Sequence, residues 1–93
     1  MEKNGYIKKA QAKLDELNGN IKLLKAKKDN LEAEVQIEYD KKIEEIELLK
    51  KDVENRLDDI NSSSNEAWIE LKNGFEKSSR IMEETVKSAL SKF

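Results

Sequence analysis

Apolar side chains recur along the first part of the chain at alternating steps of three and four residues. The series runs from Ile7 to Val35, and Lys28 is its one polar position. A mean spacing of about 3.5 residues is the heptad repeat of a coiled coil, whose apolar seam faces partner helices only when the helices supercoil to the left. The pattern therefore predicts a helix that packs lengthwise against other helices.

The register of this seam changes after Val35. An unbroken heptad would continue through polar residues, but the next apolar side chains are Tyr39, Ile43 and Ile46. This shift is a stutter, and beyond it the spacing averages about 3.6 residues, which is the period of a straight helix that packs with little supercoil. The predicted core and oligomer seam consists of Ile7, Leu14, Leu17, Ile21, Leu24, Leu31, Val35, Tyr39, Ile43, Ile46, Val53, Leu57, Ile60, Trp68, Leu71, Phe75, Met82 and Val86.

The helical pattern is interrupted at residues 61–65, five consecutive Asn and Ser residues. Their short polar side chains favour helix ends over helix interiors. Ser63 followed by Glu66 matches a capping box, which predicts one helix over residues 4–61 and a second over 64–93. Residues 18–20 (Asn-Gly-Asn) are another candidate break, but the heptad runs through them in register, so we expect the first helix to continue.

The expected fold is therefore all-α: a long helix and a shorter helix that folds back as a hairpin, assembled into an antiparallel coiled-coil or helix-bundle oligomer. Residues 1–61 form the long coiled-coil helix of a single domain, and residues 62–93 form the capping turn and the second amphipathic helix. We expect Trp68 to be buried against the last turns of the long helix, near Leu57 and Ile60. One continuous rod through residues 61–65 is the alternative.

Composition limits the chemistry that this chain can perform. The sequence contains no Cys, His or Pro, and 41% of its residues are charged while 37% are apolar. Structural zinc sites, haem attachment and the common nucleophile and base pairs need Cys or His. The three glycines are too far apart to form a phosphate-binding loop. We therefore expect no enzyme activity, no catalytic residue, no cofactor and no metal.

Charge is distributed unevenly along the chain, although the net charge is only −2. Residues 1–28 contain eight lysines and three acidic residues, a net charge of +5, whereas residues 29–60 contain five basic and twelve acidic residues, a net charge of −7. Because flanking charges select coiled-coil orientation, this asymmetry predicts an antiparallel homodimer centred near Leu31. Tyr6 would then lie beside Ile60 of the other subunit and far from Ile60 of its own.

Three alternative surface roles have weaker support. A lysine cluster at Lys22, Lys25, Lys27 and Lys28 could contact phosphates, but it lacks interleaved aromatic residues, which disfavours nucleic acid. Carboxylates at residues 44–47 and 58–59 lack a second, convergent ligand set for a cation. The apolar stripe of residues 64–93 could lie on a membrane surface, but that segment has five basic and five acidic residues. A solvated helix surface and core packing explain these features better.

Two segments of the second half resemble a family of small bacterial coiled-coil proteins of unassigned function. They are Glu66 to Gly74 (EAWIELKNG) and Ser88 to Phe93 (SALSKF), and Tyr6, residues 12–18 and residues 37–39 extend the similarity over the full length. Family members often repeat an Ala-Trp pair where this chain has Ser78 and Ser79. The resemblance implies a soluble, helical bacterial protein, sometimes linked to stress, and it supplies no catalytic residue.

These features together predict a non-enzymatic structural or protein-interaction protein that acts as a homo-oligomer, with an unknown protein as a further partner. The alternative is a peripheral lipid-surface or chaperone-like binder that uses the amphipathic helix 64–93. The start of the chain has no apolar segment typical of an export signal, and no apolar run approaches the length of a membrane span. The expected location is the cytoplasm.

Overall fold

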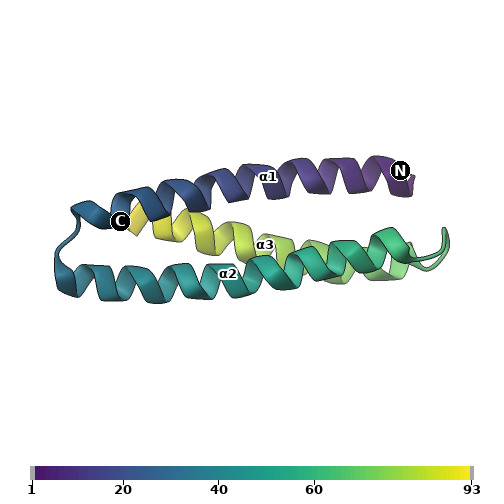
Figure 1. Cartoon of the computed structure of the whole chain (residues 1–93). Helices are drawn as coiled ribbons and strands as arrows, with labels where there is room; N and C mark the ends of the chain where they lie inside the picture. The colour runs from purple at the N-terminus through teal and green to yellow at the C-terminus, as the bar shows by residue number, and fades with distance from the viewer. Residues whose placement is uncertain (1, 93) are drawn as a thin grey trace.

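The computed structural model describes residues 2–92, which form three α-helices packed side by side in an elongated bundle (Figure 1). Helix α1 covers Lys3–Lys27, a short 3₁₀ turn η1 covers Lys28–Asn30, α2 covers Ala33–Ser62 and α3 covers Trp68–Lys92. Helix α2 runs antiparallel to both α1 and α3 (Figure 1). Residues 2–92 contain no β-strand, so the all-α fold is confirmed.

The expected single helix over residues 4–61 is wrong, because the chain reverses direction after η1. Leu31 (φ −97°, ψ 152°) and Glu32 (φ −64°, ψ 154°) are extended, and these two residues turn α2 back along α1. The reversal lets the heptad seam of α1 pack against helices of its own chain. Asp29 and Asn30, which are residue types typical of turns, were the local sign of this break.

Hydrogen bonds hold the turn between α1 and α2. The Leu31 N–H donates to the Lys28 carbonyl at 3.1 Å, and the Gln36 side-chain amide donates to the Leu31 carbonyl at 2.9 Å. The buried Tyr39 hydroxyl of α2 donates to the Leu24 carbonyl in the last turn of α1. Carbonyls at the end of a helix have no helical donor, so this hydroxyl satisfies a group that would otherwise be buried without a partner.

The predicted break in the Asn and Ser run is confirmed, but its capping residue is one position later than expected. The Ser63 hydroxyl donates back to the Ile60 carbonyl at 2.6 Å and so finishes α2. The Ser64 hydroxyl accepts a hydrogen bond from the Ala67 N–H at 3.1 Å and starts the next helix. Ser63 belongs to the end of α2, so the predicted capping box with Glu66 is not the cap of α3, which begins at Trp68 rather than near residue 64.

The charge complementarity predicted between subunits is present within one chain. Lys25 of α1 pairs with Glu47 of α2 at 2.7 Å, and Lys28 pairs with Asp40 at 2.9 Å. At the other end of the bundle, the Lys3 amine donates to the Ser63 carbonyl at 2.7 Å. The start of α1 therefore lies beside the end of α2 in the same molecule, and the expectation that these regions are far apart within a subunit is wrong.

Candidate functional site

The predicted seam forms the core of a single bundle. Most of its residues are buried: Leu14, Leu17, Ile21, Leu24, Tyr39, Ile46, Val53, Leu57, Ile60, Trp68, Phe75, Met82 and Val86. Ile7, Leu31, Ile43 and Val35 are half-buried, and the first three of them pack against this core. Leu71 is 39% exposed and lies outside this core. Tyr6 is buried and belongs to the core, although the seam analysis chose its neighbour Ile7.

Tyr6 is the centre of an aromatic cluster at the end of the bundle that holds the α2–α3 connection. Its ring centroid lies 5.4 Å from that of Trp68 and 6.0 Å from that of Phe75, and the Lys72 amine lies 5.3 Å from the Tyr6 centroid. The Tyr6 hydroxyl donates to the Glu76 carboxylate at 3.1 Å. Burial, together with this hydrogen bond, raises the pKa of Tyr6 well above its usual value. The cluster joins α1 to α3 and satisfies the polar tip of a buried side chain.

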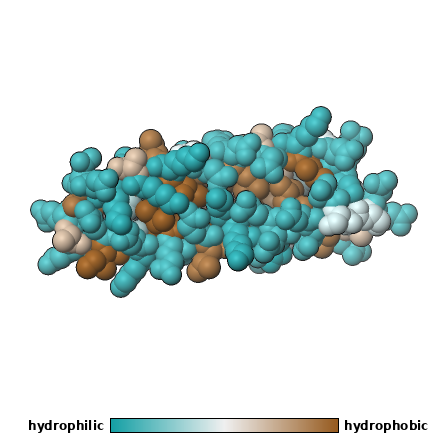
Figure 2. Space-filling view, viewed as in Figure 1, coloured by the Kyte–Doolittle hydropathy of each residue, from teal (hydrophilic) through white to brown (hydrophobic). Residues whose placement is uncertain are grey.

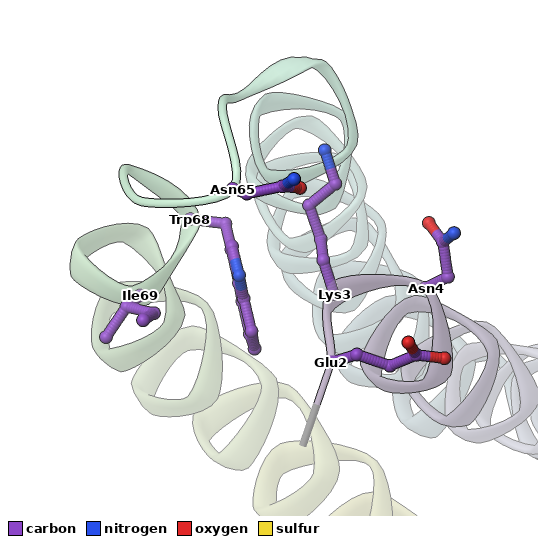
Figure 3. A pocket seen from close by; sticks show the side chains of 6 residues that line it. All are labelled: Glu2, Lys3, Asn4, Asn65, Trp68 and Ile69. Carbon is purple, nitrogen blue, oxygen red and sulfur yellow. The ribbon is translucent and has the colours of Figure 1, made fainter.

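A groove lies beside this cluster, where the start of α1 meets the α2–α3 connection (Figure 3). Its lining residues are Glu2, Lys3, Asn4, Asn65, Trp68 and Ile69. The Lys3 amine is engaged with the Asn61 and Ser63 carbonyls at 3.3 and 2.7 Å, where a cation is favoured by the dipole of α2. The lysine therefore stabilises the end of α2, and the lining brings together no pairing of a nucleophile with a base.

Carboxylates do not converge into a metal site anywhere in the part of the chain that the structure describes. Within residues 2–92, no group of three or more acidic side chains is placed to hold a metal ion. Several of the carboxylates form ion pairs with lysines instead. Glu83 of α3 pairs with Lys13 of α1 at 3.1 Å and with Lys87 at 2.9 Å.

These ion pairs shift the titration of the groups that form them. Hydrogen bonds from Lys87 and Lys13 lower the pKa of Glu83, and the hydrogen bond from Lys25 lowers the pKa of Glu47. The pairs between Lys13 and Glu83 and between Lys25 and Glu47 connect different helices. These pairs help to fix the helices relative to one another and do not form a reaction site.

The fold divides the lysine cluster at the end of α1 and the start of η1. Lys25 and Lys28 are paired with carboxylates of α2, whereas Lys22 and Lys27 are exposed. Two exposed lysines make a weak phosphate-binding surface, because affinity for nucleic acid depends on neutralising several phosphates at once.

The outer side of α2 carries a second heptad stripe that the sequence analysis missed. We define the outer stripe as Glu34, Ile37, Lys41, Glu44, Leu48 and Lys51, six exposed residues at alternating steps of three and four. Ile37 is 59% exposed and Leu48 is 67% exposed. Apolar groups protrude from hydrophilic surface along the lower edge of the molecule, the side on which α2 lies (Figure 2). The 3-4 spacing was the signal that could have identified this stripe.

The charged residues of the outer stripe are free of ion pairs within residues 2–92, in contrast to the paired residues that join the helices. Ile37 and Leu48 are about three helical turns apart, so they project from one face of α2. A helix face that exposes apolar side chains at this spacing, with charged positions between them, is a surface that another helix can contact. The outer stripe is the candidate functional site.

No described helix of this chain combines the length and the apolarity needed to cross a membrane. Comparisons with protein-family models, with curated proteins and with solved structures give no match to this chain.

Proposed function

We propose that this chain is a non-enzymatic structural or protein-interaction protein that acts as a homo-oligomer through its outer surface. The observation that carries this proposal is the outer stripe, which exposes Ile37 and Leu48 in line on one face of α2. Exposed apolar surface that is bordered by polar residues is typical of protein contact sites, whereas single scattered apolar residues are common on any protein.

The core is closed within one chain, which favours partner binding at the outer surface over partner binding at the seam. Leu17, Ile46 and Met82, from three different helices, are buried in one chain. Their burial needs no second molecule, so a partner that leaves the bundle folded binds outside the core. The outer stripe is available for that contact.

The test is sedimentation equilibrium of the full chain over a wide concentration range, at low and at high salt. We expect a reversible monomer–dimer equilibrium that weakens as salt screens the charged positions. A single monomeric species at every concentration would contradict the homo-oligomer.

A lipid-surface or chaperone-like role for residues 64–93 has less support. Trp68, Phe75 and Met82 supply the apolar face of α3, and all three are buried in the bundle. Binding to an apolar surface through this face would require α3 to leave the core. The test is to add vesicles of anionic lipid and follow Trp68 fluorescence, which we expect to stay unchanged.

A further inference from the structure

The outer stripe of α2 has a symmetric chemical pattern. Read from its first residue, the stripe is acidic, apolar and basic, and its second half repeats the order acidic, apolar and basic. The midpoint of the stripe lies between Lys42 and Ile43. Reversing the direction of the helix about this midpoint exchanges each acidic position with a basic one and each apolar position with the other.

This pattern matches an antiparallel pair of α2 helices related by a two-fold axis at the midpoint. Ile37 of one chain then lies opposite Leu48 of the other, and Lys41 lies opposite Glu44. Glu34 lies opposite Lys51 at the ends of the contact. A two-fold axis repeats every contact, so two apolar contacts are flanked by four pairs of opposite charge.

We propose that the outer stripe is a homodimer interface, in which a second copy of this chain packs its α2 antiparallel to the first. The inference rests on the proposed function and specifies its partner and geometry. The alternating 3-4 spacing provides a seam for left-handed packing at a crossing angle of about 20° and an interaxial distance of about 8–10 Å. From Glu34 to Lys51 the contact is about 26 Å long.

Charge selects the antiparallel orientation over the parallel one. A parallel pair in register would place Lys41 opposite Lys41 and Glu44 opposite Glu44. Like charges in facing positions disfavour a pairing, and orientation follows from the difference between the two arrangements. These residues form no ion pair within residues 2–92 of their own chain, so their charges are available to pair with those of a second copy.

The interface is small, so we expect a weak dimer. Exposed ion pairs contribute about 0–1 kcal/mol each, and a single helix face is at the low end of specific interface sizes. Association should therefore require concentrated protein and should weaken with salt. The fold itself does not depend on the contact, because every stripe residue is exposed in the single chain.

Charge reversal tests the predicted pairing. Lys41→Glu and Glu44→Lys each create two like-charge contacts per dimer, and we expect each to weaken self-association by about tenfold or more, which corresponds to about 1.4 kcal/mol. The double variant restores opposite charges and should recover the dimer. An equimolar mixture of the two single variants should form heterodimers. Glu70→Lys, the same charge change as Glu44→Lys at an exposed residue of α3, is the matched control and should leave association unchanged.

Cross-linking tests the direction of the pair, because the natural chain has no cysteine. We would mix the full-length variants Ile37→Cys and Leu48→Cys and add a bismaleimide shorter than the roughly 16 Å that separates these positions along α2. The expected product is a link between the two different variants and none in either variant alone. Ile81→Cys replaces an exposed apolar residue of α3 and is the control, which should give no link when it is mixed with either variant.

The outcomes separate failure of this interface from failure of the proposed function. Links within a single variant would show parallel pairing and overturn the proposal. A dimer in sedimentation without the mixed link would also overturn it but would leave the homo-oligomer standing. A monomer at all concentrations would overturn both the interface and the proposed function.

Discussion

The rings of Tyr6 and Trp68 lie 5.4 Å apart at a tilt of 41°, which joins the first turn of α1 to the first turn of α3. The apolar spacing of the sequence predicts a buried Trp68, and its 6% exposure confirms this. Leu57 and Ile60 belong to the same core cluster. The aromatic partner of Trp68 is Tyr6, a residue from the opposite end of the chain, and this contact needs the reversal between α1 and α2.

Trp68→Ala should strongly destabilise the bundle. Truncation of a buried aromatic residue typically costs about 3–5 kcal/mol, and here it also removes the contact with Tyr6. We expect a lower melting temperature and faster proteolysis within α3, measured by circular dichroism and limited digestion. Ile69→Ala changes an exposed neighbour and is the control. An unchanged melting temperature for Trp68→Ala would show that α3 does not depend on this contact.

Tyr6 should make stability depend on pH in alkaline solution. Its pKa is raised in the folded protein by burial and by the hydrogen bond to Glu76, whereas the unfolded chain titrates near 10. The Tyr6 hydroxyl therefore contributes fully to the free energy of unfolding below pH 10, and this contribution is lost as the pH rises above that value. Urea unfolding from pH 8 to 11.5 should show a steeper loss of stability for the natural chain than for Tyr6→Phe. At pH 8 that variant should be less stable by about 0.5–1.5 kcal/mol. Parallel pH profiles for the two proteins would refute this role of the hydroxyl.

Gly19→Ala should stabilise the protein. Gly19 is inside α1, its φ is not positive, and an added Cβ would meet nothing within 4 Å. Glycine in a helix interior costs about 1 kcal/mol relative to alanine, so we expect the free energy of unfolding to rise by about that amount.

Gly74→Ala is the matched comparison on α3. A Cβ at Gly74 would come within 2.9 Å of the Arg56 guanidinium, so the arginine must move away from this position. The gain from helix propensity should therefore be smaller than at Gly19. An equal or larger gain at Gly74 in chemical denaturation would show that this close approach carries no cost.

Glu32→Pro should favour the three-helix bundle over a continuous helix. Glu32 has φ −64°, which is the angle that proline prefers, and Leu31 before it is already extended. In a continuous helix the residue 32 amide would bond to the Lys28 carbonyl, but here that carbonyl accepts from Leu31. We expect a gain of about 0.4–1 kcal/mol in urea unfolding. A marked loss of helix content would indicate that the chain spans this region as one helix in solution.

The sequence by itself determined the helical class, most of the core and the break after α2. Periodicity carries this information because a helix that buries one face must repeat its apolar residues with the helical period. Leu14, Ile46 and Val86 were assigned to the core in this way and are buried. The Asn and Ser run was readable because its side chains bond locally to the backbone, as Ser63 and Ser64 do.

Only the tertiary structure decided that the helices meet within one chain. The seam stays in register through Lys28 and Leu31, so the local pattern is the same for a continuous helix and for a reversal. The two conformations differ mainly in the ψ angles of Leu31 and Glu32. The contacts that stabilise the reversal come from residues distant in sequence, such as Tyr39 and Glu47. The same reason hid the outer stripe of α2: the spacing of Ile37 and Leu48 was visible, but which stripe faces solvent depends on where α1 and α3 pack.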